Sequence, residues 1–141
     1  MKHLFVIDPI DTQTLELNSS VKLAYALHAD GSKVWFTSIR ALTVATAASC
    51  PVCECRAITF TDADFRSICI DPASEIRPLN YFAAVHMRKD PPFDLQYLTA
   101  THILDHVDVP VFNSPVALRN LNEKISILHF PAASIPALVS A

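Results

Sequence analysis

Apolar runs alternate with amphipathic stretches in the first third of the chain. Residues 3–8 form a short apolar strand that ends at Asp8. Asn18 offers N-cap chemistry for a helix, and Gly31 provides its C-terminal stop. A second apolar run follows at residues 34–36. This order predicts a β-α-β unit, which begins a parallel sheet.

The middle of the chain has a different pattern. Residues 41–49 and 53–60 are rich in β-branched residues and flank a proline-containing turn, which predicts a β-hairpin. Residues 61–80 are polar, contain prolines and indicate no regular element. The hairpin therefore interrupts the α/β alternation as an insertion.

The α/β alternation resumes in the second half of the chain. An apolar run at 81–87 predicts a buried strand, and residues 94–107 carry the apolar spacing of a helix. Residues 109–112 predict another short strand. The segment from residue 113 to 130 predicts helix, with a further strand at 137–139. We expect an α/β fold with a mainly parallel sheet.

Composition narrows the range of functions. The 141 residues fit one domain, and 11 Lys and Arg against 14 Asp and Glu give a net charge of −3. Nucleic acids and anionic membranes are bound by concentrated positive charge, so we expect neither as a partner. No apolar stretch approaches the ~20 residues of a membrane span. The apolar run at the N-terminus is too short for the hydrophobic core of a signal peptide. Together these observations favour the cytoplasm as the compartment. A single glycine excludes a glycine-rich phosphate loop.

Cysteine and histidine spacings raise two metal hypotheses. Cys50-Pro51-Val52-Cys53 resembles half of a zinc knuckle, but no second pair follows at matching spacing. We therefore favour the thiols as non-ligating side chains, with a zinc module as the alternative. His102 and His106 stand four apart on the predicted helix, without the glutamate of an HExxH motif, and surface histidines are the preferred interpretation.

Polar residues follow the predicted parallel strands at the points where they end. The carboxyl ends of such strands share one edge of the sheet, where ligands bind in open α/β folds. Arg88 can bind a carboxylate with two parallel hydrogen bonds, although a solvated charge cluster is the alternative. The candidate substrate-binding residues at this edge are Asp8, Ser19, Ser20, Arg88, Lys89, Asp90, Asn113 and Ser114.

Several of these residues belong to motifs of a known family. The motifs are Asp8-Pro9-Ile10, the run Met87-Arg88-Lys89-Asp90-Pro91-Pro92-Phe93-Asp94, Asn113-Ser114-Pro115, Leu118-Arg119 and Asn122-Glu123-Lys124. Together they resemble the N-terminal domain of bacterial glutathione synthetase. The resemblance covers essentially the whole chain, strongly at 1–30 and 86–141 and faintly at 41–80.

The resemblance implies a Rossmann-like, three-layer pre-ATP-grasp domain over residues 1–121. Residues 122–141 would be a linker and the beginning of an ATP-grasp domain missing from this chain. Such an enzyme joins γ-glutamylcysteine to glycine with ATP and Mg²⁺ through an acyl phosphate. By resemblance, Arg88 and Lys89 hold substrate carboxylates or developing negative charge, and Asp8 suits the substrate ammonium or an arginine.

The resemblance also implies what this chain can and cannot do by itself. It places Lys124 where the family's lysine reaches the nucleotide, and it puts Asn18 where the family has aspartate before two hydroxyl residues. The chain alone is expected to be inactive, as an excised domain or a truncated relative. The alternative is a stand-alone binding or assembly module with the same fold, for which a homo-oligomer stays open.

Overall fold

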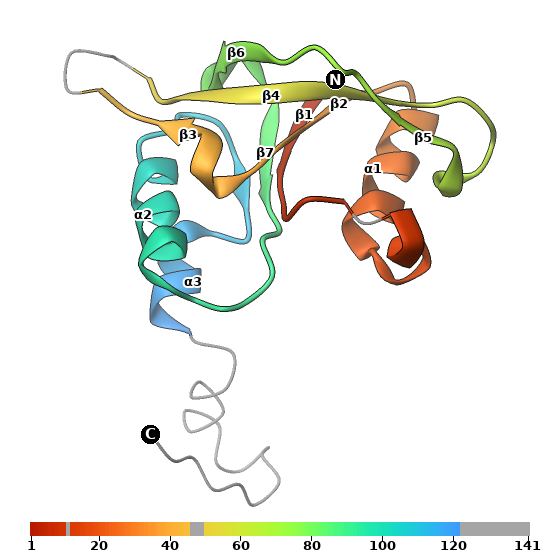
Figure 1. Ribbon diagram of the computed structural model, residues 1–141. Helices are drawn as coiled ribbons and strands as arrows, with labels where there is room; N and C mark the ends of the chain where they lie inside the picture. Colours follow the sequence, from red (N-terminus) through yellow and green to blue (C-terminus); the bar gives the residue numbers. More distant parts are fainter. Residues whose placement is uncertain (11, 46–49, 122–141) are drawn as a thin grey trace, which may run out of the picture.

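Helices cover both faces of one sheet (Figure 1). The computed structural model describes residues 1–10, 12–45 and 50–121. The elements are, in chain order, β1 (Lys2–Val6), α1 (Ser19–Ala29), β2 (Lys33–Thr37), β3 (Leu42–Thr43), β4 (Val52–Phe60), β5 (Ile68–Ile70), β6 (Glu75–Pro78), β7 (Ala84–Met87), α2 (Leu95–Leu104), β8 (Val111–Phe112) and α3 (Pro115–Asn120). Short 3₁₀ turns at Thr12–Leu17, Ile39–Ala41, Phe65–Ser67 and Leu79–Tyr81 connect them.

The strands are ordered β3-β4-β2-β1-β7-β8 across the sheet. The strands β2, β1, β7 and β8 run parallel to their neighbours, whereas β4 is antiparallel to β2. The predicted β-α-β unit is confirmed, because β1 pairs with β2 in parallel from Lys2↔Lys33 to Val6↔Thr37. The structure thus confirms the α/β fold class.

The long strand β4 organises the inserted part of the sheet. It pairs antiparallel with four strands, β2, β3, β5 and β6. The β3–β4 pairing, with Leu42 opposite Cys53, confirms the predicted hairpin, whose residues 46–49 lie outside the described residues. The strands β5 and β6 lie in the unassigned region 61–80, and neither contains a fully buried residue. β5 is apolar at all three positions, and in β6 the apolar Ile76 is exposed between the half-buried Glu75 and Arg77, so neither strand has the apolar-inside alternation that predicts a half-buried strand.

The side chains of β1 show how the sheet divides the core. Leu4 and Val6 point to one face, where they pack in a cluster that includes Tyr97 and Leu104 of α2. Phe5 points to the other face and packs in a cluster with Val21 of α1. This alternation follows from the two-residue period of a strand. It produces three layers, with α1 on one face of the sheet and α2 on the other.

The second half of the chain follows the predicted order with shorter elements. The strand predicted at 81–87 is β7, and the residues before it form a 3₁₀ turn. The helix predicted at 94–107 is α2, whose N-cap Asp94 accepts a 2.8 Å hydrogen bond from the Tyr97 amide. The predictions for 122–130 and 137–139 and for Lys124 concern residues that the structure does not describe. Within the described residues, no helix is long and apolar enough to cross a membrane.

We expect Asn18→Ala to destabilise the chain by about 1 kcal/mol. The Asn18 side chain accepts hydrogen bonds from the amides of Ser20, at 3.0 Å, and Val21, at 3.1 Å, at the beginning of α1. Alanine leaves both amides without this partner. Urea unfolding of both proteins measures the change, and Asn18→Asp is expected to retain most of the stability. An unchanged midpoint in Asn18→Ala would contradict a capping role.

Candidate functional site

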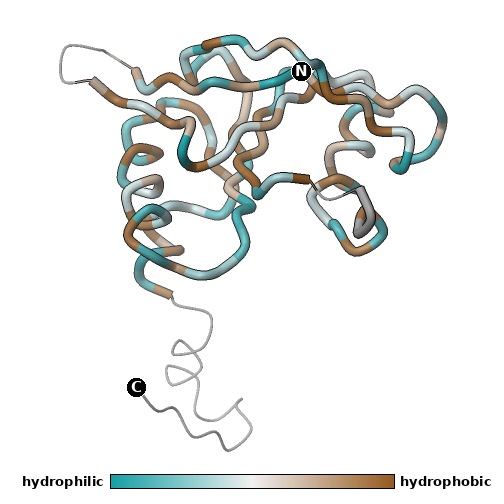
Figure 2. Tube along the Cα trace, in the orientation of Figure 1, coloured by the Kyte–Doolittle hydropathy of each residue, from teal (hydrophilic) through white to brown (hydrophobic). Residues whose placement is uncertain are grey.

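The carboxyl ends of β1, β7 and β8 bring the predicted site residues to one edge of the sheet, as the topology requires. In Figure 2 the chain changes from apolar to hydrophilic where β7 passes into residues 88–90. We call the following group the polar edge: Asp8, Ser19, Ser20, Arg88, Lys89, Asp90, Asn113 and Ser114.

Arg88 connects β7 to the beginning of α1. Its amide donates to the Val6 carbonyl at 2.9 Å, which continues the pairing with β1. Its Nε donates to Ser20 Oγ at 2.9 Å, and its Nη2 donates to Ser19 Oγ at 2.7 Å. Among the described residues Arg88 has no carboxylate partner. Its positive charge is therefore oriented by neutral hydroxyls and remains available to an anionic ligand.

Asp8 closes the loop that follows β7. Lys89 Nζ lies 3.1 Å from Asp8 Oδ1, and the Asp90 amide donates to Asp8 Oδ2 at 3.0 Å. Lys89 Nζ also donates to the Asp90 carbonyl. The structure thus pairs Asp8 with Lys89, whereas the resemblance suggested a substrate ammonium or an arginine as its partner.

Asn113 and Ser114 contribute differently to the edge. Asn113 has a φ of 62°, and its Nδ2 donates to the Met87 carbonyl at 2.8 Å. This bond ties the end of β8 to the end of β7. Ser114 precedes α3 and is exposed, and its side chain makes no capping hydrogen bond. Asn113 therefore has a positioning contact, while Ser114 is an exposed residue of the edge.

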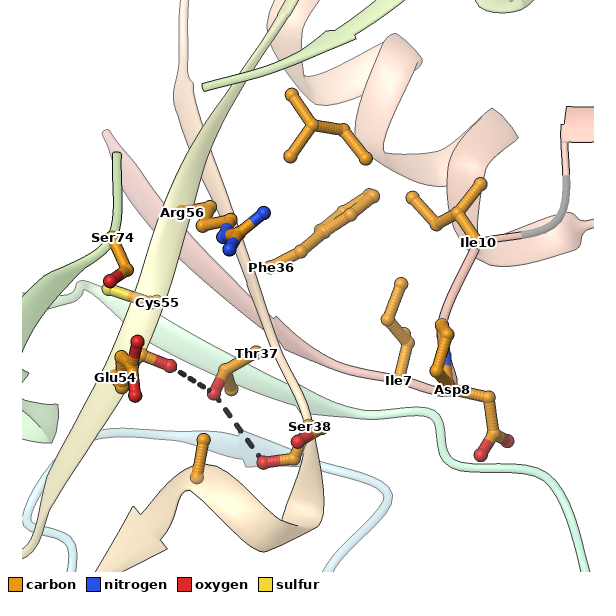
Figure 3. Close-up of a pocket in the computed structure, with 13 residues that line it drawn as sticks. Ile7, Asp8, Ile10, Phe36, Thr37, Ser38, Glu54, Cys55, Arg56 and Ser74 are labelled. Carbon is orange, nitrogen blue, oxygen red and sulfur yellow. Dashed lines mark hydrogen bonds between the residues drawn. The ribbon is translucent and has the colours of Figure 1, made fainter. Parts of the chain in front are cut away.

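A pocket of about 390 Å³ lies beside the polar edge (Figure 3). Asp8 is the member of the polar edge that lines it. The sequence patterns did not select the other polar residues that line the pocket, which are Thr37, Ser38, Glu54, Arg56 and Ser74. Glu54 and Arg56 alternate with buried cysteines along β4, and this alternation was the available signal that both side chains share one face.

The cysteines form no metal centre in the described part of the chain. No group of three or more His, Cys, Asp or Glu side chains there could hold a metal ion. Cys53 and Cys55 are both buried, and Cys55 Sγ donates to the Glu75 carbonyl at 3.6 Å. The contact with Cys55, together with burial, raises the pKa of the Cys53 thiol, so this thiol stays protonated. On α2, His102 lies 4.0 Å from Asp105.

The fold is an α/β domain whose parallel strands end at a polar edge. A family model described as "Prokaryotic glutathione synthetase, N-terminal domain" matches residues 1–119. The chain belongs to this family.

Curated relatives agree with the family match. The chain is 38% identical to a glutathione synthetase of Thermosynechococcus vestitus over 97% of its own length and 46% of that protein. It is 33% identical to the glutathione synthetase of Ralstonia nicotianae over 99% of its own length and 43% of that protein. A third glutathione synthetase, from Synechococcus elongatus, is 36% identical over all of this chain and over 46% of the relative. The chain thus spans less than half the length of these relatives.

The described residues do not fit a nucleotide–magnesium site. Gly31, the single glycine, has a φ of 81° and lies in the turn between α1 and β2. No carboxylate cluster suited to a metal occurs in the described ranges. The polar edge instead offers hydroxyls and the Arg88 guanidinium, which has no carboxylate partner among the described residues, and these groups suit an anionic organic ligand.

Proposed function

We propose that this chain is the substrate domain of a glutathione synthetase and binds γ-glutamylcysteine at the polar edge. In the complete enzyme this domain would form one wall of the cleft in which γ-glutamylcysteine and glycine are joined with ATP through an acyl phosphate. ATP and Mg²⁺ would bind mostly to the remaining part of that enzyme, and Lys124 would contribute from this chain. A cytoplasmic location belongs to the same proposal.

The orientation of Arg88 is the observation that carries this proposal. Two short hydrogen bonds from its Nε and Nη2 to serine hydroxyls of α1 orient the guanidinium without neutralising it. Lys89, by contrast, is paired with Asp8. A carboxylate of the substrate can therefore bind Arg88 without breaking an existing ion pair.

We expect Arg88→Ala to weaken binding of γ-glutamylcysteine to the purified chain at least tenfold. The variant loses charge-assisted hydrogen bonds to the ligand and the contacts that join β7 to α1. Calorimetric titration measures the dissociation constants of both proteins, with a reductant present to keep the ligand thiol free.

The control variant is Arg77→Gln on β6. Arg77 pairs with Glu75 and lies outside the polar edge, so this variant is expected to bind like the wild type. Equal affinity of wild type and Arg88→Ala would contradict the role of Arg88. No saturable binding to the wild-type chain would contradict substrate binding by this domain alone.

Ligase activity is tested by adding the part of a relative that this chain does not span. The chain is joined to the downstream portion of the Thermosynechococcus vestitus relative, and release of ADP is followed. We expect release that requires both γ-glutamylcysteine and glycine. The alternative of a stand-alone binding or assembly module stays a prediction, which light scattering coupled to size exclusion tests.

A further inference from the structure

The pocket beside the polar edge is formed where α1 stops covering the sheet. On this face of β4, Ile58 and Phe60 are buried in the cluster that includes Val21 and Ala24 of α1. Glu54 and Arg56, further toward the beginning of β4, are exposed on the same face. The volume of about 390 Å³ lies within the range of about 300–1,000 Å³ typical of small-molecule sites.

Among the residues that the structure describes, Arg56 is the arginine whose side chain has no hydrogen-bond or ion-pair partner. Among the described residues, every other arginine side chain donates to a carboxylate, a hydroxyl or an amide oxygen; these arginines are Arg40, Arg66, Arg77, Arg88 and Arg119. Arg56 makes no such contact with the described part of the chain. Phe36 is its cross-strand partner, so both side chains lie on the same face of the sheet. Figure 3 shows the guanidinium beside the Phe36 ring and within the pocket.

The other lining groups restrict the class of ligand. Ile7, Ile10 and Phe36 provide an apolar wall suited to a short aliphatic chain. Glu54 and Asp8 provide acidic groups, and Asp8 is already paired with Lys89. A ligand with a carboxylate for Arg56 and an ammonium for Glu54 matches both charges, and an α-amino acid head has these two groups.

We infer that this pocket binds the α-amino acid head of a γ-glutamyl compound, with its α-carboxylate on Arg56. The inference rests on the proposed function and assigns the non-reacting end of the substrate. The cysteine carboxyl reacts with ATP, so it must face the cleft between this domain and the rest of the enzyme. The pocket is lined by this domain, so it suits the end of γ-glutamylcysteine that takes no part in the reaction.

Two ligands and one charge-removing variant test the assignment. The ligands are γ-glutamylcysteine and 4-aminobutyrylcysteine, which lacks only the α-carboxylate. Wild-type chain is expected to bind γ-glutamylcysteine at least tenfold more tightly than the analogue. Arg56→Gln is expected to bind both ligands with the same weak affinity, because the carboxylate has lost its partner. Calorimetry measures the affinities, and amide chemical shifts of Phe36 and Thr37 report occupancy of the pocket.

Arg77→Gln is the matched control and is expected to retain the wild-type preference between the two ligands. Equal binding of γ-glutamylcysteine by wild type and Arg56→Gln overturns the inference, even where Arg88→Ala confirms the polar edge. The inference is also overturned if Arg56→Gln lowers the affinity for γ-glutamylcysteine and for 4-aminobutyrylcysteine by the same factor. Absence of binding to wild type contradicts substrate binding by this domain as well, so failure of the inference alone is distinguishable. Thermal melting of each variant verifies that it is folded.

Discussion

Phe5→Ala is expected to lower the free energy of unfolding by about 3–5 kcal/mol. Phe5 is fully buried on β1, an interior strand of the parallel part of the sheet, between β2 and β7. The Phe5 ring stacks on the His86 ring, with the two ring centroids 4.4 Å apart. It meets the Phe36 ring edge-on, with the centroids 5.7 Å apart. Alanine leaves a cavity between sheet and α1, and neighbours held in β2 and β7 cannot collapse into it.

Urea unfolding at neutral pH, followed by circular dichroism, measures this loss. Leu95→Ala at the beginning of α2 is the control, because the Leu95 side chain is 76% exposed and its truncation opens no cavity. We expect the control to change stability by less than about 0.5 kcal/mol. A Phe5→Ala variant as stable as the control would show that the layer between sheet and α1 is not closely packed.

Acidification from pH 8 to pH 4.5 is expected to destabilise the chain by about 2.5 kcal/mol through His86 alone. His86 is buried on β7, where its ring lies between those of Phe5 and Phe112. Burial, followed by the nearby charges of His3 and Arg88, lowers the pKa of His86 to about 4. Burial also lowers the pKa of His3, whose Nδ1 lies 3.1 Å from His86 Nε2.

The direction in which stability changes with pH follows from which state, folded or unfolded, binds more protons. The unfolded chain protonates His86 near its ordinary pKa of about 6.5, whereas the folded chain resists protonation until about pH 4. The unfolded state therefore binds more protons between these values, and stability is lost as the pH falls through this window. The pKa values of the Glu16, Asp64 and Glu75 carboxyls are lowered in the folded chain, so their losses of stability set in only as the pH reaches their ordinary values of 4.5, 3.8 and 4.5, at the acid end of this range.

Urea unfolding of wild type and His86→Phe across pH 4.5–8 tests this prediction. Phenylalanine preserves stacking on Phe5 and binds no proton, so the pH dependence is expected to be much shallower. His102→Gln on the exposed side of α2 is the matched control and should retain the wild-type slope. A slope unchanged by His86→Phe would assign the acid sensitivity to other groups.

Local signals were sufficient for much of the fold and for part of the site. Asn18 and Gly31 marked the ends of α1, and the apolar runs marked β1, β2 and β7. The rule that ligands bind at the carboxyl ends of parallel strands selected Arg88 and Asp8, which the structure places at one edge. The pocket around Arg56 was missed, because it depends on which strand lies next to β2.

By itself, the sequence determined most of the elements, though not β5 and β6, and the edge at which polar side chains gather. Caps, turns and apolar periodicity act over a few residues and can be read directly from the chain. The tertiary structure decided which side chains come into contact with one another. Arg88 is oriented by hydroxyls that lie 68 and 69 positions away, and Phe36 meets Arg56 through an antiparallel pairing. Such contacts depend on how the whole sheet assembles, because each pairing becomes favourable only when the apolar faces of the strands are buried together.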